Sequence, residues 1–183
     1  LYRMDYAEMA RFHWENDADI IVAVQPASKE DAPRLGLLKR QSDGLITDFV
    51  EKPTDPEVLK NFVSRDDPGR PYLGSMGIYF FKTDVLLDLL ESTTDDDFGG
   101  QVIPNAIHTH KVCGFDFEGY WEDIGTIRSF YEVNLKLASS ETPFDFYDPK
   151  NRIYSRPRFL PSSRVDGATL EDVMLADGCL IGK

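Results

Sequence analysis

The chain has 183 residues, of which 42% are hydrophobic, and its formal net charge is −12. The hydrophobic share, with 12 Phe and 8 Tyr, supports a packed core and excludes a disordered chain. The acidic charge repels nucleic acid and anionic lipid, so both are excluded as partners, and a phosphate-bearing ligand needs a local cation or a metal ion.

The first part of the sequence alternates between predicted helix and predicted strand. We expect a helix at residues 4–16 and then a buried strand at 19–26 that is stopped by a proline. Two short strands, at 35–40 and 45–53, flank the sequence QSDG, in which Asp43-Gly44 is a strong signal for a hairpin turn.

After a turn-rich loop, the alternation continues with a strand at 73–81 and a helix that we expect Thr83 to cap. Residues 95–110 are expected to form a second helical region, and residues 111–117 alternate as a strand that runs into GYWEDIGT. Thr126 is a good N-cap for the next helix. Strands that alternate with helices predict a layered α/β domain up to about residue 138.

The sequence changes character after Ser139. Residues 139–163 contain four prolines and no helical period, so we expect a linker. In residues 164–183, LEDVML and ADGCLI align at six-residue spacing, which is the register of a hexapeptide β-helix. Two such units cannot bury a core of their own, so we expect only the start of a β-helix.

The two cysteines, Cys113 and Cys179, lie far apart and lack CxxC spacing, which favours neither a disulfide framework nor a zinc site. They fit small buried side chains in a reducing cytoplasm, and we expect a cytoplasmic location. No run of 18 apolar residues occurs, so the sequence predicts no membrane span.

Two short sequences contain candidate ligand-binding residues. In DFVEKP, Glu51 and Lys52 leave the end of a strand, where open α/β sheets bind ligands; the lysine suits a phosphate and the carboxylate can accept hydroxyls. The alternative is a solvated charge pair worth under about 1 kcal/mol. In GSMGIY, near a predicted strand start, the Ser75 hydroxyl either donates to a ligand oxygen or serves a tight turn.

The sequence GYWEDIGT is a candidate metal-binding motif. On an extended strand, the two-residue period places Trp121 and Asp123 on the same face. Asp123 then lies just before the helix that follows Thr126, where it either ligates a metal ion or serves as a cap or loop residue. Mg²⁺ is generally bound through one or two carboxylates plus substrate phosphates, so the motif requires a second aspartate elsewhere.

The order of these motifs, together with IYSRPRFLP in the linker, resembles the ADP-glucose pyrophosphorylases (glucose-1-phosphate adenylyltransferases) from Leu1 to Lys183. Other sugar-nucleotide pyrophosphorylases share FVEKP, SMGIY and YWEDIGT in looser form, whereas the linker sequence favours ATP as the nucleotide. The resemblance implies an α/β fold: the C-terminal portion of a Rossmann-like nucleotidyltransferase domain with a mixed sheet (1–138), then a linker (139–163) and the first rungs of a left-handed parallel β-helix (164–183).

The resemblance also implies an activity, the Mg²⁺-dependent transfer of AMP from ATP to α-D-glucose 1-phosphate in glycogen or starch synthesis. It implies that Lys52 and Asp123 are catalytic and that Asp123 ligates Mg²⁺. It implies allosteric control and a homotetramer. The residues that match the family's glucose 1-phosphate site are Gly36, Glu51, Lys52, Ser75 and Trp121.

Two parts of the family pattern are missing. The glycine-rich loop for ATP and a second metal-binding aspartate would both fall upstream of Leu1. The sequence has no initiator Met and ends in mid-pattern as GCLIGK. We therefore expect the sugar-phosphate half of a catalytic domain, which does not catalyse alone.

Three alternatives stay open. The nucleotide base is chosen largely by residues outside this sequence, so the enzyme can be a uridylyl-, thymidylyl- or guanylyltransferase. A second alternative is a non-catalytic regulatory subunit of a hetero-oligomer. A third is a structural or oligomerisation module whose acidic surface serves solubility. A panel of nucleotides and a glucose 1-phosphate titration would separate these cases.

Overall fold

A computed structural model describes residues 1–154 and 156–182 of the chain. The chain divides into two compact units. We call Met4–Gly119 the sheet unit, and Leu1–Arg3 together with Tyr120–Lys183 the C-terminal unit. The two cysteines are free thiols, with Cys113 buried and Cys179 partly exposed.

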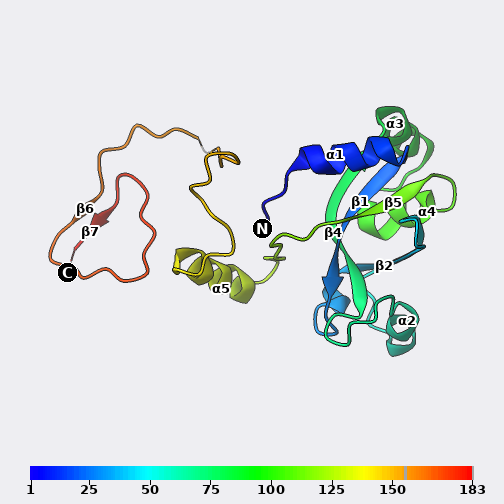
Figure 1. Cartoon of the computed structure of the whole chain (residues 1–183), viewed down its shortest axis with the longest axis horizontal. Coiled ribbons are helices and arrows are strands. Elements are labelled where there is room, and N and C mark those ends of the chain that lie inside the picture. The colour runs from blue at the N-terminus through cyan, green and yellow to red at the C-terminus, as the bar shows by residue number, and fades with distance from the viewer. Residues whose placement is uncertain (155, 183) are drawn as a thin grey trace. The chain divides into compact units, whose positions relative to one another are not determined.

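The sheet unit is built on a five-stranded sheet with the order β3-β2-β4-β1-β5 (Figure 1). β1 and β5 are parallel, whereas the pairs β1–β4, β2–β3 and β2–β4 are antiparallel, so the predicted mixed α/β sheet is confirmed. The strands are β1 (Ile20–Ala27), β2 (Gly36–Arg40), β3 (Ile46–Glu51), β4 (Tyr72–Phe81) and β5 (Val112–Asp116).

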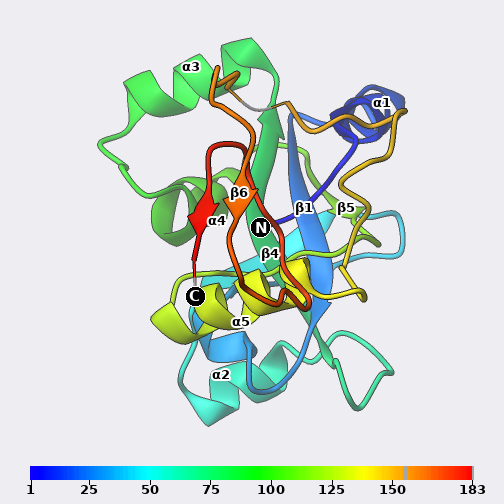
Figure 2. The same cartoon turned by 90° about the vertical axis from the view of Figure 1, so that its left-hand side faces the viewer.

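Helices cover both faces of this sheet (Figures 1 and 2). α1 contacts β1 and β4 through its buried residues Met9 and His13. On the other face, the π-helical turn η2 and the short helix α4 pack against β3. The helical elements are α1 (Tyr6–Glu15), the 3₁₀ turn η1 (Ala32–Arg34), α2 (Pro56–Asn61), α3 (Thr83–Ser92), η2 (Phe98–Val102) and α4 (Ile103–Ala106).

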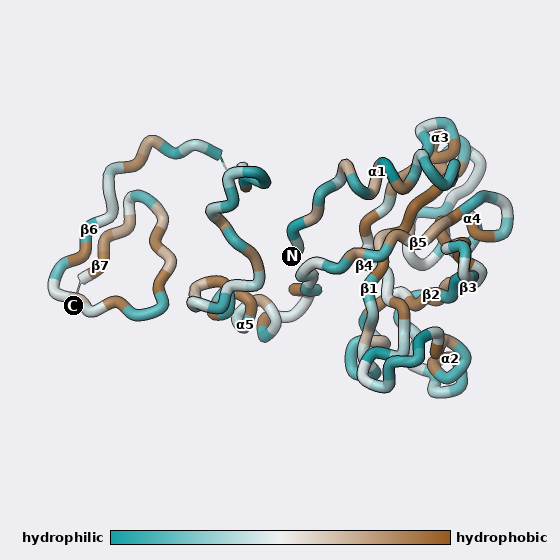
Figure 3. Tube along the Cα trace, in the orientation of Figure 1, coloured by the Kyte–Doolittle hydropathy of each residue, from teal (hydrophilic) through white to brown (hydrophobic). Residues whose placement is uncertain are grey.

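The core is centred on β1, whose residues Ile20–Val24 have no exposed surface. A continuous apolar run is typical of a strand that has neighbours on both sides and helices on both faces. Ile20, Val22 and Val24 belong to the cluster that includes Val102 and Ile103. Because side chains alternate along a strand, the residues between them, Ile21 and Ala23, point to the opposite face, which α1 covers. Hydrophobic residues are concentrated in β1 and β5, and hydrophilic ones in the loops beside α2 (Figure 3).

The hairpin prediction is confirmed, since Gln41 N–H donates to Leu45 O and Gly44 has a φ of +90°. The predicted end of β1 at Pro26 is wrong, because the strand continues to Ala27 and Pro26 pairs with Leu73 of β4. The parallel partner β5 has already ended opposite Val24, so Pro26 has a neighbouring strand on one side only, where a proline is tolerated.

The predicted cap of α3 is also wrong. Lys82 is the N-cap and Thr83 is the first helical residue. Leu86 N–H donates to Lys82 O, so the helix starts one residue before the predicted position. Lys82 N–H donates to Asp19 O. The sequence reading also missed α2, although Asp55 caps it and Pro56 stands at its first position, which is a common helix start.

In the C-terminal unit, α5 (Ile127–Ala138) begins at the predicted N-cap Thr126. Its hydroxyl accepts from Ser129 N–H at 3.0 Å, and the Ser129 hydroxyl accepts from Thr126 N–H at 3.2 Å. The apolar side chains on this helix are largely exposed, and Ile127 retains 90% of its accessible surface.

The end of the C-terminal unit contains two short strands, β6 (Arg164–Val165) and β7 (Leu180–Ile181). They are parallel, with Arg164 opposite Leu180 and Val165 opposite Ile181. Between α5 and β6, the residues that the structure describes form neither helix nor strand. Within the described part of the chain, the helices are too short or too polar to cross a bilayer.

Candidate functional site

Three of the predicted site residues meet where β2 begins and β3 ends. Gly36, the first residue of β2, lies opposite Glu51, the last residue of β3. Lys52 follows with a φ of +45°, and its N–H donates to Leu35 O at 3.1 Å. A left-handed conformation is uncommon for a lysine, and such strained residues cluster at functional sites.

The side chains of Glu51 and Lys52 form an ion pair, with 3.1 Å between Oε1 and Nζ. The Lys52 side chain is 63% exposed and that of Glu51 is 27% exposed. The pair therefore combines an accessible cation with a more enclosed carboxylate. In this arrangement the lysine can bind an anionic group of a ligand while the carboxylate accepts hydrogen bonds from hydroxyls of the same ligand.

Ser75 is the fourth of the ten residues of β4. It is buried, and its hydroxyl accepts from Gly77 N–H at 3.2 Å. Gly77 has a φ of +69° at the point where the register between β1 and β4 shifts. The bulge at this point explains why a glycine stands at position 77 and why the Ser75 hydroxyl bonds to the backbone two residues ahead.

Tyr79 connects Ser75 to the charged pair, and the sequence reading missed it. Burial raises the pKa of Tyr79, and the nearby carboxylates of Glu51 and Asp97 raise it further. A hydrogen bond with the Ser75 side chain acts in the opposite direction. Ser75, Tyr79 and Glu51 thus belong to one neighbourhood, in which the phenol stays protonated near neutral pH.

The turn η2 supplies the remaining wall of this neighbourhood. The Phe98 ring stacks on Tyr79 with 6.1 Å between ring centroids, and it also contacts Phe81. Asp97 caps the turn, since its Oδ1 accepts from Gly99 N–H at 2.9 Å. In the sequence this turn is visible as DFGG after an acidic run, but its nearness to Glu51 is not, because Glu51 lies far away in the chain.

The other two predicted residues, Trp121 and Asp123, belong to the C-terminal unit. The expected extended strand is wrong, because β5 ends at Asp116 and Trp121 forms only an isolated bridge with Tyr2. Asp123 is not the cap of α5, which is Thr126. Its Oδ1 accepts from Gly125 N–H at 3.2 Å, which folds the backbone into a local turn.

The described residues contain no group of three or more His, Cys, Asp or Glu side chains that could hold a metal ion by themselves. Asp123 supplies one carboxylate, of which a single oxygen is occupied by a backbone N–H. Mg²⁺ at substrate sites needs only one or two carboxylates, with phosphates as the other ligands. Asp123 therefore fits as one ligand of such an ion.

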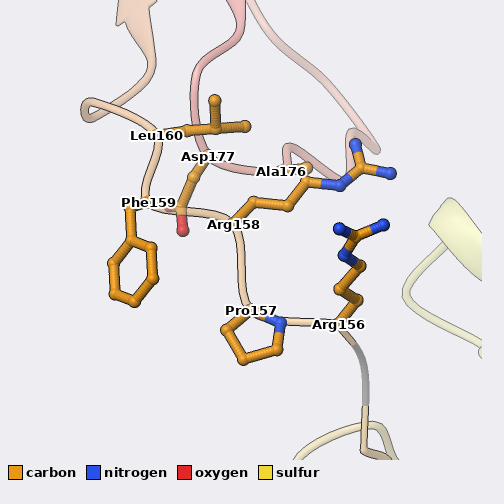
Figure 4. Close-up of a pocket in the computed structure, with 7 residues that line it drawn as sticks. All are labelled: Arg156, Pro157, Arg158, Phe159, Leu160, Ala176 and Asp177. Atoms are coloured by element: carbon orange, nitrogen blue, oxygen red, sulfur yellow. The ribbon is translucent and has the colours of Figure 1, made fainter.

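Two cavities lie outside this neighbourhood of charged residues. In the sheet unit, a cavity of about 530 Å³ lies near the start of β5, beside Asp43, His110 and Lys111. In the C-terminal unit, a cavity of about 480 Å³ is lined by residues that include Arg156, Arg158 and Asp177. The two arginine side chains extend to the same side of the backbone, away from the Phe159 ring (Figure 4).

Comparison with known proteins identifies the family of the chain. The model of the nucleotidyl transferase family matches residues 1–140. The chain belongs to this family.

One relative within this family is similar to almost the whole chain. Over 191 aligned residues, the chain is 44% identical to glucose-1-phosphate adenylyltransferase large subunit 1, chloroplastic/amyloplastic, from Zea mays. The alignment covers 99% of this chain and 37% of the relative, so the chain spans little more than a third of that protein's length. The resemblance inferred from the motifs is confirmed.

Proposed function

We propose that the chain is part of a glucose-1-phosphate adenylyltransferase and contributes its glucose 1-phosphate site. The observation that carries this proposal is the Glu51–Lys52 pair, held at a strand end with Lys52 in a left-handed conformation. Its support from the comparisons is the 44% identity to the maize enzyme subunit. The reaction joins ATP and α-D-glucose 1-phosphate and releases pyrophosphate.

Each site residue has a role that follows from its chemistry. Lys52 binds the sugar phosphate as a point charge, and Glu51 accepts hydrogen bonds from sugar hydroxyls. Gly36 and Ser75 line the same site, and Trp121 forms an apolar wall. Asp123 holds Mg²⁺ together with phosphate oxygens and, in the proposal, with a second aspartate that this sequence does not include.

The chemistry is an in-line displacement at phosphorus. A phosphate oxygen of glucose 1-phosphate forms a bond to the α-phosphorus of ATP, and the bond from that phosphorus to the departing pyrophosphate breaks. The attacking oxygen is already an anion, so no strong general base is required. Two unit charges 4 Å apart repel by about 4 kcal/mol at an effective dielectric of 20, so bringing two phosphorylated anions together is the main electrostatic cost.

Lys52 lowers this cost by placing a cation beside the sugar phosphate. Glu51 and its neighbours fix the sugar ring, which keeps the attacking oxygen in line. When bound, Mg²⁺ neutralises phosphate charge and orients the triphosphate. We propose that ATP binds to a glycine-rich loop upstream of these residues, and that the 183 residues do not turn over by themselves.

The proposal extends to the rest of the chain. Residues 1–138 form the sugar-phosphate half of the nucleotidyltransferase domain, residues 139–163 a linker, and residues 164–183 the first rungs of a left-handed β-helix. The parallel pairing of β6 with β7 supports the β-helix, because successive coils of such a helix pair in parallel. A homotetramer and a cytoplasmic location complete the proposal.

The test compares the 183-residue chain with the same chain extended upstream through the nucleotide-binding loop. Each is incubated with glucose 1-phosphate, Mg²⁺ and one of ATP, UTP, GTP or dTTP, and pyrophosphate release is followed. We expect release with ATP from the extended chain alone, and its loss in Asp123→Asn. Asp172→Asn, an exposed position of the same unit, is the matched control. Pyrophosphate release with another nucleotide would refute ATP as the substrate. Turnover by the 183-residue chain would refute its proposed dependence on the upstream segment.

A second candidate function is a non-catalytic regulatory subunit of a hetero-oligomer. The specific observation in its favour is that the maize relative is named as a large subunit. The extended chain would then bind glucose 1-phosphate saturably but release no pyrophosphate with any nucleotide. Asp123→Asn would leave that binding unchanged.

A further inference from the structure

We propose that Gly99 is a positioning residue for the Glu51 carboxylate, and that it acts through the side chain it lacks. The inference rests on the proposed function, in which Glu51 accepts hydrogen bonds from the sugar. Gly99 lies in η2 and Glu51 at the end of β3, so the two residues are brought together only by the packing of η2 on that strand.

The evidence is the space that a side chain would need. A methyl group on Gly99 would lie 2.9 Å from Glu51 Oε2, 3.2 Å from Cδ and 3.5 Å from Oε1. A methyl group on Gly36 would lie 2.7 Å from the same Oε2. The Glu51 carboxylate therefore occupies a notch between two glycines, one from β2 and one from η2.

The backbone of Gly99 does not require glycine. Its φ lies outside the left-handed region, in contrast to those of Gly44 and Gly77. Its N–H is held by Asp97 Oδ1 at 2.9 Å, a bond that an alanine would keep. An alanine at this position can adopt the same conformation, so the missing side chain serves the neighbouring carboxylate.

The atoms that an added methyl group would displace are the end of a flexible side chain. Glu51 is 27% exposed, so its carboxylate can turn toward solvent without disturbing the core. That movement would take Oε1 away from Lys52 Nζ, 3.1 Å away at present, and would remove the proposed hydroxyl acceptor. Gly36 is a less selective position, because a methyl group there would also lie 2.6 Å from the Phe49 ring.

The first test measures the carboxylate directly and needs no ligand. The ¹³C resonance of Glu51 Cδ, assigned with Glu51→Gln, is compared in the wild-type chain, Gly99→Ala and Gly69→Ala. Gly69 is a matched control because its N–H donates to Asp67 Oδ1 at 3.0 Å, while its methyl group would meet only Asp67 at 3.4 Å. We expect the Glu51 resonance to shift in Gly99→Ala alone, and an unchanged resonance overturns the inference.

The second test is a double-mutant cycle on the dissociation constant for glucose 1-phosphate. We expect Gly99→Ala to raise the constant about tenfold, which is about 1.4 kcal/mol, in the wild-type background. In the Glu51→Gln background it should have no further effect, because Gly99 acts through that carboxylate. Equal effects in both backgrounds, or no effect of Gly99→Ala when Glu51→Gln weakens binding, overturn the inference. If Glu51→Gln itself leaves the constant unchanged, the proposed function fails instead.

Discussion

Replacing Lys52 with glycine is expected to stabilise the sheet unit and to weaken glucose 1-phosphate binding. The backbone of Lys52 has a φ of +45°, and this conformation costs an L-residue about 1 to 2 kcal/mol. Glycine relieves that strain but loses about 0.5 to 1 kcal/mol through its more flexible unfolded chain. The net gain in the free energy of unfolding then lies between about 0 and 1.5 kcal/mol, with a middle value of about 0.7 kcal/mol.

The variant Lys52→Gln separates the backbone from the charge. It keeps the strained backbone and removes the ion pair with Glu51, which is largely exposed and worth under about 1 kcal/mol. We therefore expect Lys52→Gly to unfold at a higher temperature than Lys52→Gln, by about 2 °C, in thermal unfolding followed by circular dichroism.

Binding should change in the opposite direction to stability. A phosphate charge 4 Å from the Lys52 ammonium would gain about 4 kcal/mol at a dielectric of 20. Because the side chain is 63% exposed, solvent screening reduces this to about 1 to 2 kcal/mol, or roughly 5- to 30-fold in the dissociation constant. The loss should be similar in both variants and should shrink as the salt concentration rises.

The control is Lys60→Gln, which removes another exposed lysine of the sheet unit. It should leave both the dissociation constant and the unfolding temperature close to wild type. A lower unfolding temperature for Lys52→Gly than for Lys52→Gln would refute the strain argument. Wild-type affinity in both Lys52 variants would refute the role of Lys52 as the phosphate-binding cation.

Two further predictions concern stability. Thr126→Ala removes the hydroxyl that accepts from Ser129 N–H, so we expect the first turn of α5 to lose about 1 kcal/mol and to exchange its amide hydrogens faster; unchanged exchange would contradict the capping role. The pKa of Asp19 is lowered below its ordinary value of 3.8, chiefly by Lys111 N–H and further by the Lys82 ammonium. Its folded-state pKa is the lower one, so its contribution is present above pH 3.8 and is lost as the pH falls through the lowered value. Urea midpoints of wild type and Asp19→Asn should therefore converge in acid, and a constant difference at all pH values would count against this assignment.

Much of the fold followed from patterns within short segments. The apolar run at 19–26, the Asp43-Gly44 turn and the Thr126 cap each depend on neighbours within a few residues, and each was predicted. The family resemblance likewise rests on short motifs, and the comparisons confirm it. The helix α2 had an equally local signal, Asp55-Pro56, which the sequence reading overlooked.

The errors arose where a distant strand or backbone group decided the outcome. Pro26 remains in β1 because its parallel partner has already ended, and Lys82 caps α3 because Asp19 O fixes its N–H. GYWEDIGT was interpreted as a strand from its alternation, but β5 ends earlier; Trp121 forms an isolated bridge with Tyr2, and Glu122 N–H donates to Leu1 O. Pairing depends on which backbone groups are free across the sheet, and a single segment does not contain that information.

The candidate site likewise has features that the sequence predicts and features that only the tertiary structure shows. Glu51 and Lys52 could be recognised in the sequence because they are adjacent and stand at the end of a predicted strand. The left-handed backbone of Lys52, the Tyr79 phenol beside Glu51 and the notch formed with Gly99 could not, since each depends on contacts between separate elements. Local residue chemistry is enough to specify turns, caps and the order of strands and helices. The position of one carboxylate between two glycines exists only after β2, β3 and η2 have packed together, because close packing alone brings those residues within contact distance.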